Sequence, residues 1–335
     1  MRQYVLPTAT GIDALALIEC DVPRPGRGQI LVRMRAASLN FRDLAVASGK
    51  YIMSKLPPNL VPLSDGAGEI VELGAEITGL APGDRVAGLF MQSWMGGRME
   101  PDDGLTALGG AIDGVLTEYR LFDARGVVRI PAHFSFEQAA TLPCAALTAW
   151  NALFGYQQLL PGETVLTLGT GGVSIFALQF AHAAGARVIA TSSSDEKLAR
   201  ALALGASDGI NYKDTPEWQA RVRALTGGRG VDHVVEVGGP GTLQRSVQSA
   251  RHGGMVTLIG VLTRGTLDPL VVFGAGAIVR PIYVGSRQMF EAMNAAITQH
   301  QITPIIDRVF PFEDAPAAYR HLKGATHVGK VVISI

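Results

Sequence analysis

The sequence predicts an α/β protein in which a doubly wound parallel sheet is joined to a smaller, barrel-like β module. Beyond about residue 130, apolar strand-like runs alternate with helical segments, a pattern typical of βαβ units. Before about residue 120, the signals are short strands separated by Gly and Pro. The final run, GKVVISI, fits best with the first module. We therefore expect the parallel-sheet domain to be inserted within the chain of the other one.

Composition places the chain among globular proteins large enough for two domains. Of its 335 residues, 47% are hydrophobic and 17% are charged, which is too apolar for a disordered chain. The 29 basic and 29 acidic side chains balance, so nothing attracts the protein to nucleic acid or to an anionic membrane. With two cysteines, no signal-peptide pattern and no long apolar run, we expect a cytoplasmic protein that acts on a small molecule.

The first module is predicted as a series of short strands bounded by turn residues. Its strands are expected at 29–38, 68–74, 84–90 and 115–122. The C-terminal tail is predicted as a helix at 286–300, a strand, a helix at 312–324 and the final strand at 329–335. That last strand is the part of the tail expected to complete the first module.

The parallel-sheet domain is predicted from apolar runs with helices between them. The runs lie at 164–169, 187–192, 209–212, 231–237 and 254–260. Helix starts are expected at residues whose side chains can cap a helix: Ser135, Ser194, Thr215 and Thr242. A further strand at 278–286 contains Pro281, which suits the edge of a sheet because proline cannot donate to a neighbouring strand.

A glycine-rich turn directly follows the first of these strands and opens a helix. Gly169-x-Gly171-x-x-Ser174 has the spacing of a dinucleotide-binding loop. The first glycine permits a tight turn, the second lets backbone N–H groups approach a pyrophosphate, and the helix N-terminus favours negative charge. The alternative is a plain glycine turn. The residues expected to bind the pyrophosphate are Gly169, Thr170, Gly171, Gly172 and Val173.

The end of the second strand indicates which dinucleotide binds. An NAD site places an acidic residue there to hold the ribose 2′-OH, but this chain has Ser192 and Ser193. Hydroxyl groups remove the repulsion that a carboxylate would exert on a 2′-phosphate, so NADP(H) is the expected cofactor. Two further side chains could complete a phosphate pocket: Lys197 and Tyr212. In the alternative, Asp195 or Glu196 holds the ribose of NAD.

Together with other stretches, these motifs resemble the medium-chain dehydrogenase/reductase superfamily, and within it the zinc-independent branch around the quinone oxidoreductases. The matching stretches are AASLNFRDLAVASGKY (36–51), GAGEIVELG, PGDRV, LPCAALTAWNAL (142–153), GTGGVS, INY and GKVVI. The resemblance covers essentially the whole chain. It implies a Rossmann dinucleotide-binding domain at 125–287 and a GroES-like β-barrel catalytic domain at 1–124 and 288–335.

The same resemblance bears on whether the chain binds a metal. Zinc-dependent members of the superfamily hold their catalytic zinc with a Cys, a His and a second Cys. The residues that match these positions here are Asn40, Ser64 and Cys144. The stretch that would carry the four cysteines of a structural zinc site, 91–104, has no cysteine. We therefore expect no metal.

The resemblance also implies which residues surround the nicotinamide. These are Asn40, Thr148, Gly238, Ile259, Gly260 and Val261. Asn40 and Tyr51 are the predicted catalytic residues, each as a hydrogen-bond donor to a carbonyl oxygen. In the alternative, Asn40 makes a structural bond at the end of a strand, and Tyr51 contributes only packing.

The predicted chemistry follows from the absence of a metal. Without a Lewis acid to stabilise an alkoxide, hydride transfer to an activated acceptor is easier than oxidation of a simple alcohol. We predict an NADPH-dependent oxidoreductase that delivers hydride to a quinone, enone or other conjugated carbonyl. Two alternatives stay open: a zinc-independent alcohol or aldehyde dehydrogenase, and an NADPH-binding sensor with little turnover. In relatives the strand that matches 278–286 pairs with its symmetry mate, which implies a homodimer.

Overall fold

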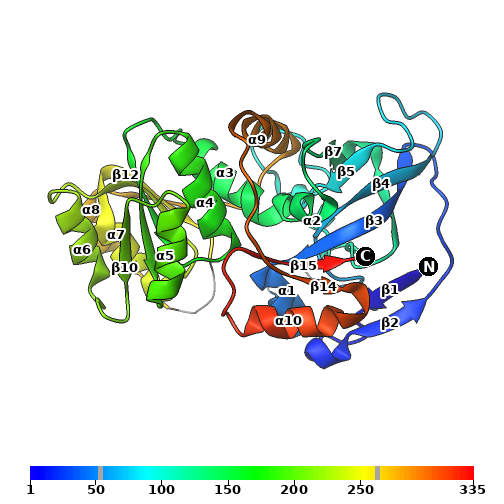
Figure 1. Ribbon diagram of the computed structural model, residues 1–335, viewed down its shortest axis with the longest axis horizontal. Helices are drawn as coiled ribbons and strands as arrows, with labels where there is room; N and C mark the ends of the chain where they lie inside the picture. Colours follow the sequence, from blue (N-terminus) through cyan, green and yellow to red (C-terminus); the bar gives the residue numbers. More distant parts are fainter. Residues whose placement is uncertain (52–55, 261–264) are drawn as a thin grey trace. The chain divides into compact units, whose positions relative to one another are not determined.

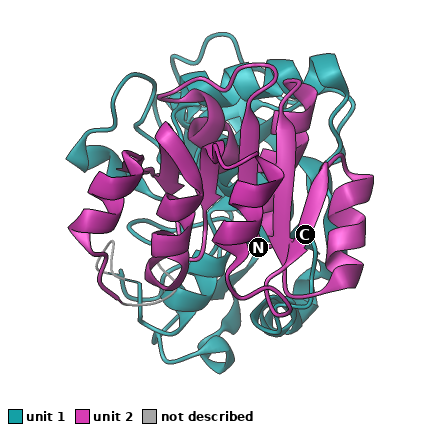
Figure 2. Ribbon diagram, turned by 90° about the vertical axis from the view of Figure 1, so that its left-hand side faces the viewer, with its two compact units in different colours: residues 1–147, 285–335 teal, residues 148–284 magenta. Residues whose placement is uncertain are grey.

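The computed structural model describes residues 1–51, 56–260 and 265–335, and these form two compact units (Figure 2). Unit 1 contains Met1–Leu147 and Gly285–Ile335, and unit 2 contains Thr148–Val284. The predicted α/β class is therefore confirmed, with a parallel-sheet unit inserted into the chain of a β-rich unit.

The first boundary between the units lies later than the predicted one, which followed residue 124. Strand β7 (Val127–Arg129) pairs antiparallel with β5 (Arg85–Gly88). The segment that follows the predicted boundary is thus held by the sheet of unit 1. Pairing between strands far apart in the sequence decided this boundary, and no local signal in the sequence reports such pairing.

The described residues of unit 1 are built on a sheet with the order β14-β15-β3-β4-β5-β7, and β6 also pairs with β3 (Figure 1). The remaining strands of this sheet are β3 (Gln29–Leu39), β4 (Asp65–Leu73), β6 (Tyr119–Asp123), β14 (Ile306–Pro311) and β15 (Lys330–Ser334). A separate hairpin consists of β1 (Arg2–Val5) and β2 (Ala16–Glu19). The α-helices are α1 (Phe41–Ala47), α2 (Phe136–Ala139), α9 (Arg287–His300) and α10 (Ala315–Lys323). Short 3₁₀ turns lie at Ile12–Ala14, Pro101–Thr106, Ala124–Gly126 and Phe312–Asp314, and a π-helical turn lies at Leu142–Ala146.

The C-terminal strand β15 completes the sheet of unit 1, as the sequence predicted. It lies between β14, to which it is parallel, and β3, to which it is antiparallel. The register pairs Val331 with Leu39 and Ile333 with Ala37. Because Lys330 begins this strand and Asn40 directly follows β3, the pairing brings two residues far apart in the sequence to the same end of the sheet.

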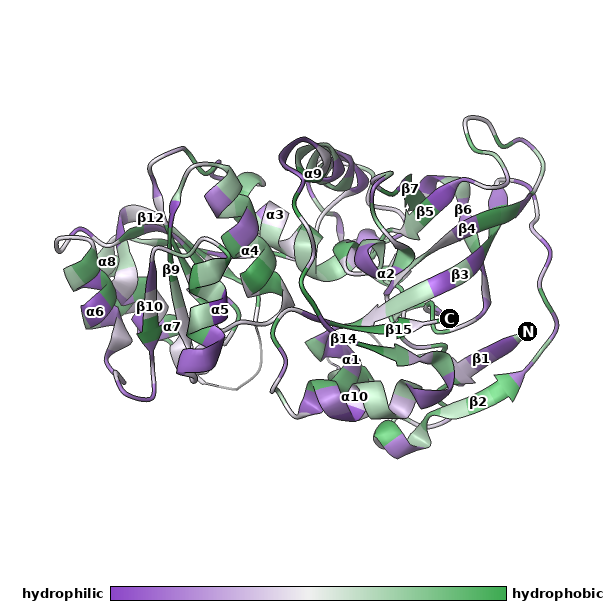
Figure 3. Cartoon of the chain, in the orientation of Figure 1, coloured by the Kyte–Doolittle hydropathy of each residue, from purple (hydrophilic) through white to green (hydrophobic). Residues whose placement is uncertain are grey.

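Helix α10 packs one face onto the core of unit 1. Its buried residues are Ala315, Ala318, Tyr319 and Leu322. This spacing of three and four residues defines one side of an α-helix, and charged residues occupy the other side. Figure 3 accordingly colours α10 in both green and purple. Tyr319 is among the largest fully buried side chains of the described chain.

Unit 2 contains a six-stranded parallel sheet with the order β10-β9-β8-β11-β12-β13. The strands are β8 (Thr164–Leu168), β9 (Arg187–Ser192), β10 (Asp208–Asn211), β11 (Val231–Glu236), β12 (Ala250–Leu258) and β13 (Ile278–Pro281). The helices are α3 (Leu147–Phe154), α4 (Gly172–Ala183), α5 (Asp195–Ala203), α6 (Trp218–Leu225), α7 (Pro240–Ser249) and α8 (Pro269–Ala275). In Figure 1, α4 and α5 lie on one face of the sheet, and α6, α7 and α8 lie on the other. This is the doubly wound arrangement that the sequence predicted.

The capping residues were predicted with mixed success. Ser135 and Gln138 form the predicted capping box, and Ser194 caps α5. The starts predicted at Thr215 and Thr242 are wrong, because α6 begins at Trp218 and α7 begins at Pro240. In α7 a proline at the first turn, with its fixed φ, sets the start, and the hydroxyl of Thr242 bonds elsewhere.

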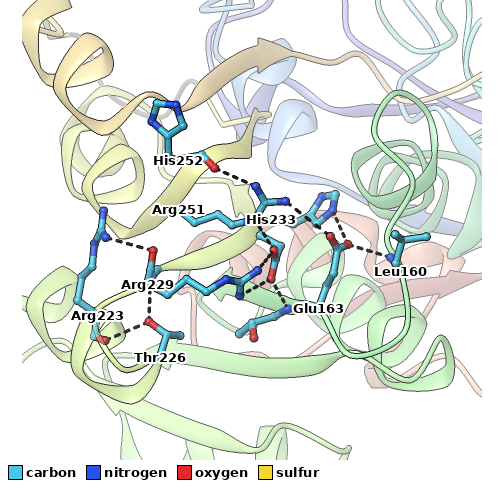
Figure 4. Close-up of polar contacts among 11 residues, drawn as sticks. Leu160, Glu163, Arg223, Thr226, Arg229, His233, Arg251 and His252 are labelled. Atoms are coloured by element: carbon cyan, nitrogen blue, oxygen red, sulfur yellow. Dashed lines mark hydrogen bonds and ion pairs between the residues drawn. The ribbon is translucent and has the colours of Figure 1, made fainter.

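Buried charges join the strands at the amino end of the sheet of unit 2. The fully buried Asp232 carboxylate accepts a hydrogen bond from the backbone N–H of Thr164 (2.9 Å), at the start of β8. It also pairs with Arg229 and Arg251, the second of which lies in β12 (Figure 4). Burial opposes the negative charge, but these partners together hold the pKa of Asp232 below its ordinary value. One carboxylate therefore links three neighbouring strands.

Candidate functional site

The glycine loop of unit 2 has the form that a dinucleotide needs. Gly169 takes a φ of 71°, a left-handed conformation that favours glycine. A Cβ built on Gly171, the residue that caps α4, would meet no atom within 4 Å. The backbone is therefore open to a ligand at the start of a twelve-residue helix. Ser174 ties the helix to its strand, since its hydroxyl donates to the carbonyl oxygen of Leu168 at 2.6 Å.

The residues expected to determine which dinucleotide binds lie at the ends of β9 and β10 and in the turn and helix that follow β9. Ser192 is buried at the end of β9, and its carbonyl oxygen accepts from the backbone N–H of Tyr212 (2.9 Å). Tyr212 itself is exposed. Asp195 is occupied, because its carboxylate accepts a hydrogen bond from the side-chain amide of Asn211 (2.9 Å). The structure thus places two of the predicted phosphate-pocket residues side by side. The other two are nearby in the chain, in the turn after β9 and in the first turn of α5: Ser193 and Lys197.

The sequence reasoning missed Glu236, the buried last residue of β11. One oxygen of its carboxylate accepts from the backbone N–H groups of Gly238 (2.7 Å) and Gly239 (2.8 Å). The hydroxyl of Thr242 donates to the same oxygen at 2.7 Å, and the hydroxyl of Ser246 donates to the other. The available signal was an acidic residue at the end of an apolar run and before two glycines.

Glu236 also joins two of the predicted cofactor-binding segments. Its backbone carbonyl oxygen accepts from the N–H groups of Ile259 (2.9 Å) and Gly260 (3.0 Å). A Cβ at Gly260 would lie 1.8 Å from the carbonyl oxygen of Val237, so only glycine fits there. Gly238, Ile259 and Gly260, which were predicted to lie near the nicotinamide, are therefore close to one another. Val261 lies outside the described residues.

These segments all follow the carboxyl ends of strands in unit 2. The glycine loop follows β8, Gly238 follows β11 and Ile259 follows β12. The strand order reverses between β8 and β11, and dinucleotides bind at such a switch point in doubly wound sheets. Unit 2 therefore has the backbone features that a dinucleotide requires. Thr148, also predicted near the nicotinamide, is buried in the first turn of α3.

In unit 1, a buried polar cluster surrounds the predicted catalytic residue Asn40. The ammonium group of Lys330 donates to the side-chain oxygen Oδ1 of Asn40 and to the carbonyl oxygen of Leu39, both at 2.6 Å. It lies 4.0 Å from the carboxylate of Asp65. Asp65 in turn accepts from the hydroxyl of Ser64 (2.7 Å) and the backbone N–H of Cys144 (3.1 Å). The cluster thus joins β3, β4, β15 and the π-helical turn.

The same cluster shows whether the residues at the zinc-ligand positions fit a metal. The oxygen of Asn40 already accepts from Lys330, and the hydroxyl of Ser64 is directed to Asp65. Burial, with the nearby Asp65 carboxylate, raises the pKa of the Cys144 thiol well above its usual range, whereas zinc binds the thiolate. Within the described ranges, no group of three or more His, Cys, Asp and Glu side chains is arranged to hold a metal ion. The donor set does not fit zinc.

Tyr51, the second predicted catalytic residue, lies next to a buried arginine. The guanidinium of Arg42 lies 4.7 Å from the ring centroid of Tyr51 and 4.7 Å from that of Phe90. Arg42 also donates to the carbonyl oxygen of Leu108 at 3.0 Å and lies 3.5 Å from the carboxylate of Asp43. The aromatic ring of Tyr51 is therefore held by a cation–π contact. The structure brings Asn40 into the same cluster, since its backbone N–H donates to Asp43 at 2.7 Å.

The comparisons with known proteins identify the family. The sequence matches the alcohol dehydrogenase GroES-like domain over residues 26–132 and the zinc-binding dehydrogenase domain over residues 172–299. It is 45% identical to the zinc-type alcohol dehydrogenase-like protein C1773.06c of Schizosaccharomyces pombe, across 100% of this chain and 99% of the relative. The chain belongs to the medium-chain dehydrogenase/reductase superfamily, as predicted. It is an oxidoreductase of that superfamily with a GroES-like and a Rossmann domain.

Solved structures share the whole fold. An NAD-dependent alcohol dehydrogenase is similar with a TM-score of 0.92 and 33% identity, covering 100% of both chains. A mycobacterial protein in complex with NADPH has a TM-score of 0.84 and 27% identity, again covering 100% of both chains. A quinone oxidoreductase from Pseudomonas syringae has a TM-score of 0.84 and 26% identity, covering 100% of this chain and 99% of the other.

Asp43 makes the stability of unit 1 depend on pH. Its carboxyl group is 1% exposed, and burial raises its pKa to about 6, although Arg42 opposes the rise. A carboxyl group with a raised folded-state pKa stabilises the protein below its unfolded pKa, and this contribution is lost as the pH rises through about 6. We expect the stability advantage of wild type over Asp43→Asn to shrink by about 3 kcal/mol between about pH 4 and pH 7.5. Urea unfolding of both proteins across this range measures it, and a constant difference would contradict the assignment.

Proposed function

We propose that the protein is an NADPH-dependent oxidoreductase that delivers hydride to a quinone, enone or other conjugated carbonyl without a metal. The observation that carries the proposal is the cluster around Asp65, where the side chains of Asn40 and Ser64, at two of the zinc-ligand positions, are already engaged by protein partners. A simple alcohol needs a Lewis acid to stabilise its alkoxide, whereas a conjugated acceptor spreads the charge it gains. The similarity to a quinone oxidoreductase is consistent with this choice.

The preference for NADPH rests on the residues that follow β9. Ser192 and Ser193 stand where an NAD site has a carboxylate. A carboxylate about 4 Å from a phosphate charge would cost roughly 4 kcal/mol at an effective dielectric constant near 20. Asp195, the alternative ribose ligand, is engaged by Asn211. Lys197, in the first turn of α5, and Tyr212 would then contact the 2′-phosphate. One similar structure is NAD-dependent and another binds NADPH, so the residues of this chain carry the argument.

Bound NADPH supplies the hydride. The protein would hold the acceptor and stabilise the negative charge that develops on its oxygen. Asn40 would donate through its side-chain amide and Tyr51 through its hydroxyl group. Arg42, against the ring of Tyr51, would restrict the positions of that hydroxyl and add positive charge nearby. Two preorganised donors of this kind do for an enolate what an oxyanion hole does for a tetrahedral intermediate.

Alcohol or aldehyde dehydrogenation is the second candidate function, because the yeast relative is described as alcohol dehydrogenase-like. The two candidates differ in acceptor and in metal use. We expect the purified protein to oxidise NADPH with a quinone or an enone, at a rate that a chelator leaves unchanged. The measurement is NADPH absorbance across a panel of quinones, enones and simple aldehydes, with and without chelator. Turnover of simple aldehydes or alcohols alone would favour the second candidate, and chelator-sensitive turnover would refute the metal-free mechanism. No turnover of any acceptor would favour an NADPH-binding sensor.

Lys197 offers a test of cofactor choice. A charge-assisted hydrogen bond to a phosphate is worth about 1.5–3 kcal/mol. Lys197→Ala should therefore raise the Kd for NADPH on the order of 10- to 100-fold and leave the Kd for NADH nearly unchanged. Lys213→Ala is a matched control, because Lys213 is an exposed lysine just beyond Tyr212. Fluorescence titration gives both constants. An equal loss of affinity for the two cofactors would show that Lys197 does not bind the 2′-phosphate.

We also propose that two copies of the chain associate through the edge of unit 2. Strand β13 lies at the end of the sheet, where it pairs with β12, and Ile278 in it is exposed. The neighbouring helix α8, partly green in Figure 3, exposes Leu270 (73%) and Phe273 (87%). An apolar patch beside a free strand edge suits pairing with an identical edge. Light scattering after gel filtration at low micromolar concentration should give twice the mass of the chain, and Phe273→Asp should halve it. A monomeric wild type would rule the dimer out.

A further inference from the structure

Lys330 is a buried cation whose role no local pattern in the sequence indicates. It is 3% exposed, and it begins β15, almost at the end of the chain. Its ammonium group donates to Leu39 and Asn40 at 2.6 Å each, and Asp65 lies 4.0 Å away. Burying an ammonium is costly unless it is paired and hydrogen-bonded, so Lys330 can be buried here only because these three partners surround it.

The contact with Lys330 determines which way the Asn40 amide faces. An ammonium group has three donors and no acceptor, so the atom that meets it must be the oxygen of the amide. A flipped amide would bring its NH₂ group against the ammonium, with a repulsive contact in place of a 2.6 Å hydrogen bond. The nitrogen Nδ2 of Asn40 therefore faces away from Lys330.

That nitrogen is a buried donor in need of an acceptor. Burial raises the pKa of Asp65, while Lys330 and hydrogen bonding from the side chains of Ser64 and Asn40 oppose the rise, so one N–H of the amide is directed toward this carboxylate. Among the described residues no acceptor meets Nδ2 at full hydrogen-bond distance and angle, and an NH₂ group has two donors, so at least one N–H is left for another acceptor. Buried polar groups in folded proteins are nearly always paired, and an unpaired one calls for an explanation such as a ligand.

We propose that Lys330 is a positioning residue that holds the Asn40 amide so that its N–H groups are presented to a carbonyl oxygen of a bound ligand. The oxygen belongs either to the acceptor or to the carboxamide of the nicotinamide. In both cases a carbonyl oxygen accepts a hydrogen bond from the amide of Asn40. The proposal rests on the proposed function, in which Asn40 is a donor. It adds that the ammonium also polarises the amide, because a cation at its oxygen strengthens the N–H donors opposite.

The test uses substitutions that keep shape and change hydrogen bonding. Asn40→Asp retains an oxygen for Lys330 and replaces the N–H donors by a second oxygen. Lys330→Met keeps the length of the side chain and removes the ammonium. Ser38→Ala is the matched control, because Ser38 is buried in the same pair of strands, where its hydroxyl donates to Val331 at 3.1 Å. It removes a β3–β15 contact without touching Asn40.

If Lys330 positions Asn40, both test variants lose kcat/KM on the order of 100-fold, as when one donor to a developing charge is removed. Ser38→Ala keeps wild-type activity. The double variant Asn40→Ala/Lys330→Met should have a kcat/KM no lower than that of the less active of its two single variants, since both changes remove the same interaction. A purely structural lysine would give additive losses, and that result would overturn the proposal.

A second readout does not depend on turnover. The side-chain NH₂ signal of Asn40 in a ¹⁵N NMR spectrum is identified by its loss in Asn40→Asp. We expect the chemical shift of this signal to change in Lys330→Met and to remain unchanged in Ser38→Ala. NADPH alone shifts the wild-type signal if the carboxamide is the acceptor, and Asn40→Asp then also weakens NADPH binding. Only an acceptor added after NADPH shifts it if the substrate oxygen is the partner. No shift with either ligand would overturn the proposal.

The outcomes separate this inference from the proposed function. If wild type turns over no acceptor, the proposed function fails, while the NMR signal still reports whether Lys330 fixes the amide. If Lys330→Met does not fold, Asn40→Asp decides, because its contact with Lys330 is retained. Wild-type kcat/KM in folded Asn40→Asp would overturn the role of the amide as a donor.

Discussion

The arrangement of unit 1 depends on the contacts that the buried ammonium group of Lys330 makes. Its partners come from the end of β3, from Asn40 and from the start of β4. They can meet only if the C-terminal strand β15 lies beside β3, in the register that pairs Val331 with Leu39. The last strand of the chain thus completes the sheet of the first unit and brings a fixed charge to its candidate catalytic residue. A buried charge of this kind tolerates little displacement, because losing any partner leaves it unsatisfied in a low-dielectric interior.

Unit 2 uses buried carboxylates for the same purpose, at the two ends of one strand. At the amino end of β11, Asp232 ties β8, β11 and β12 together through arginines and a backbone N–H. At the carboxyl end, Glu236 accepts from Gly238 and Gly239 and so shapes the loop that follows β11. Asp232 stabilises the amino end of the sheet, and Glu236 fixes the conformation of the loop at its carboxyl end. The N–H groups of Gly238 and Gly239 are thereby engaged within the loop, which fixes a backbone segment predicted to lie beside the nicotinamide.

The sequence predicted those parts of the fold that local chemistry determines. Strands, the glycine loop and the capping box at Ser135 follow from periodicity and from the backbone freedom of glycine, which neighbouring residues encode. The role of Lys330 was missed, because a buried charge is explained by its partners, and the partners of Lys330 lie about 290 residues away. The boundary after residue 124 was misplaced for the same reason, since β7 is held by a distant strand. Glu236 was missed although its side-chain partners lie within ten residues of it. Asn40 and Tyr51 were named from a resemblance, and the structure adds the contacts that hold each of them.

The Lys330 contact also gives a physical meaning to the residues that replace the zinc ligands. A zinc site needs a thiolate and free lone pairs pointing at one centre. Here the oxygen of Asn40 faces an ammonium, the hydroxyl of Ser64 donates to Asp65, and burial raises the pKa of the Cys144 thiol. Exchanging Asn40 or Ser64 alone for a metal ligand would leave the side chain of the other engaged, so these two positions depend on each other. The positive charge at this place is supplied by a lysine that is part of the fold, and it acts through an amide that can donate to an oxygen but cannot exchange its ligands. In the proposed function, such a site would stabilise the negative charge that develops on a conjugated carbonyl, whereas lowering the pKa of a simple alcohol would require coordination to a metal.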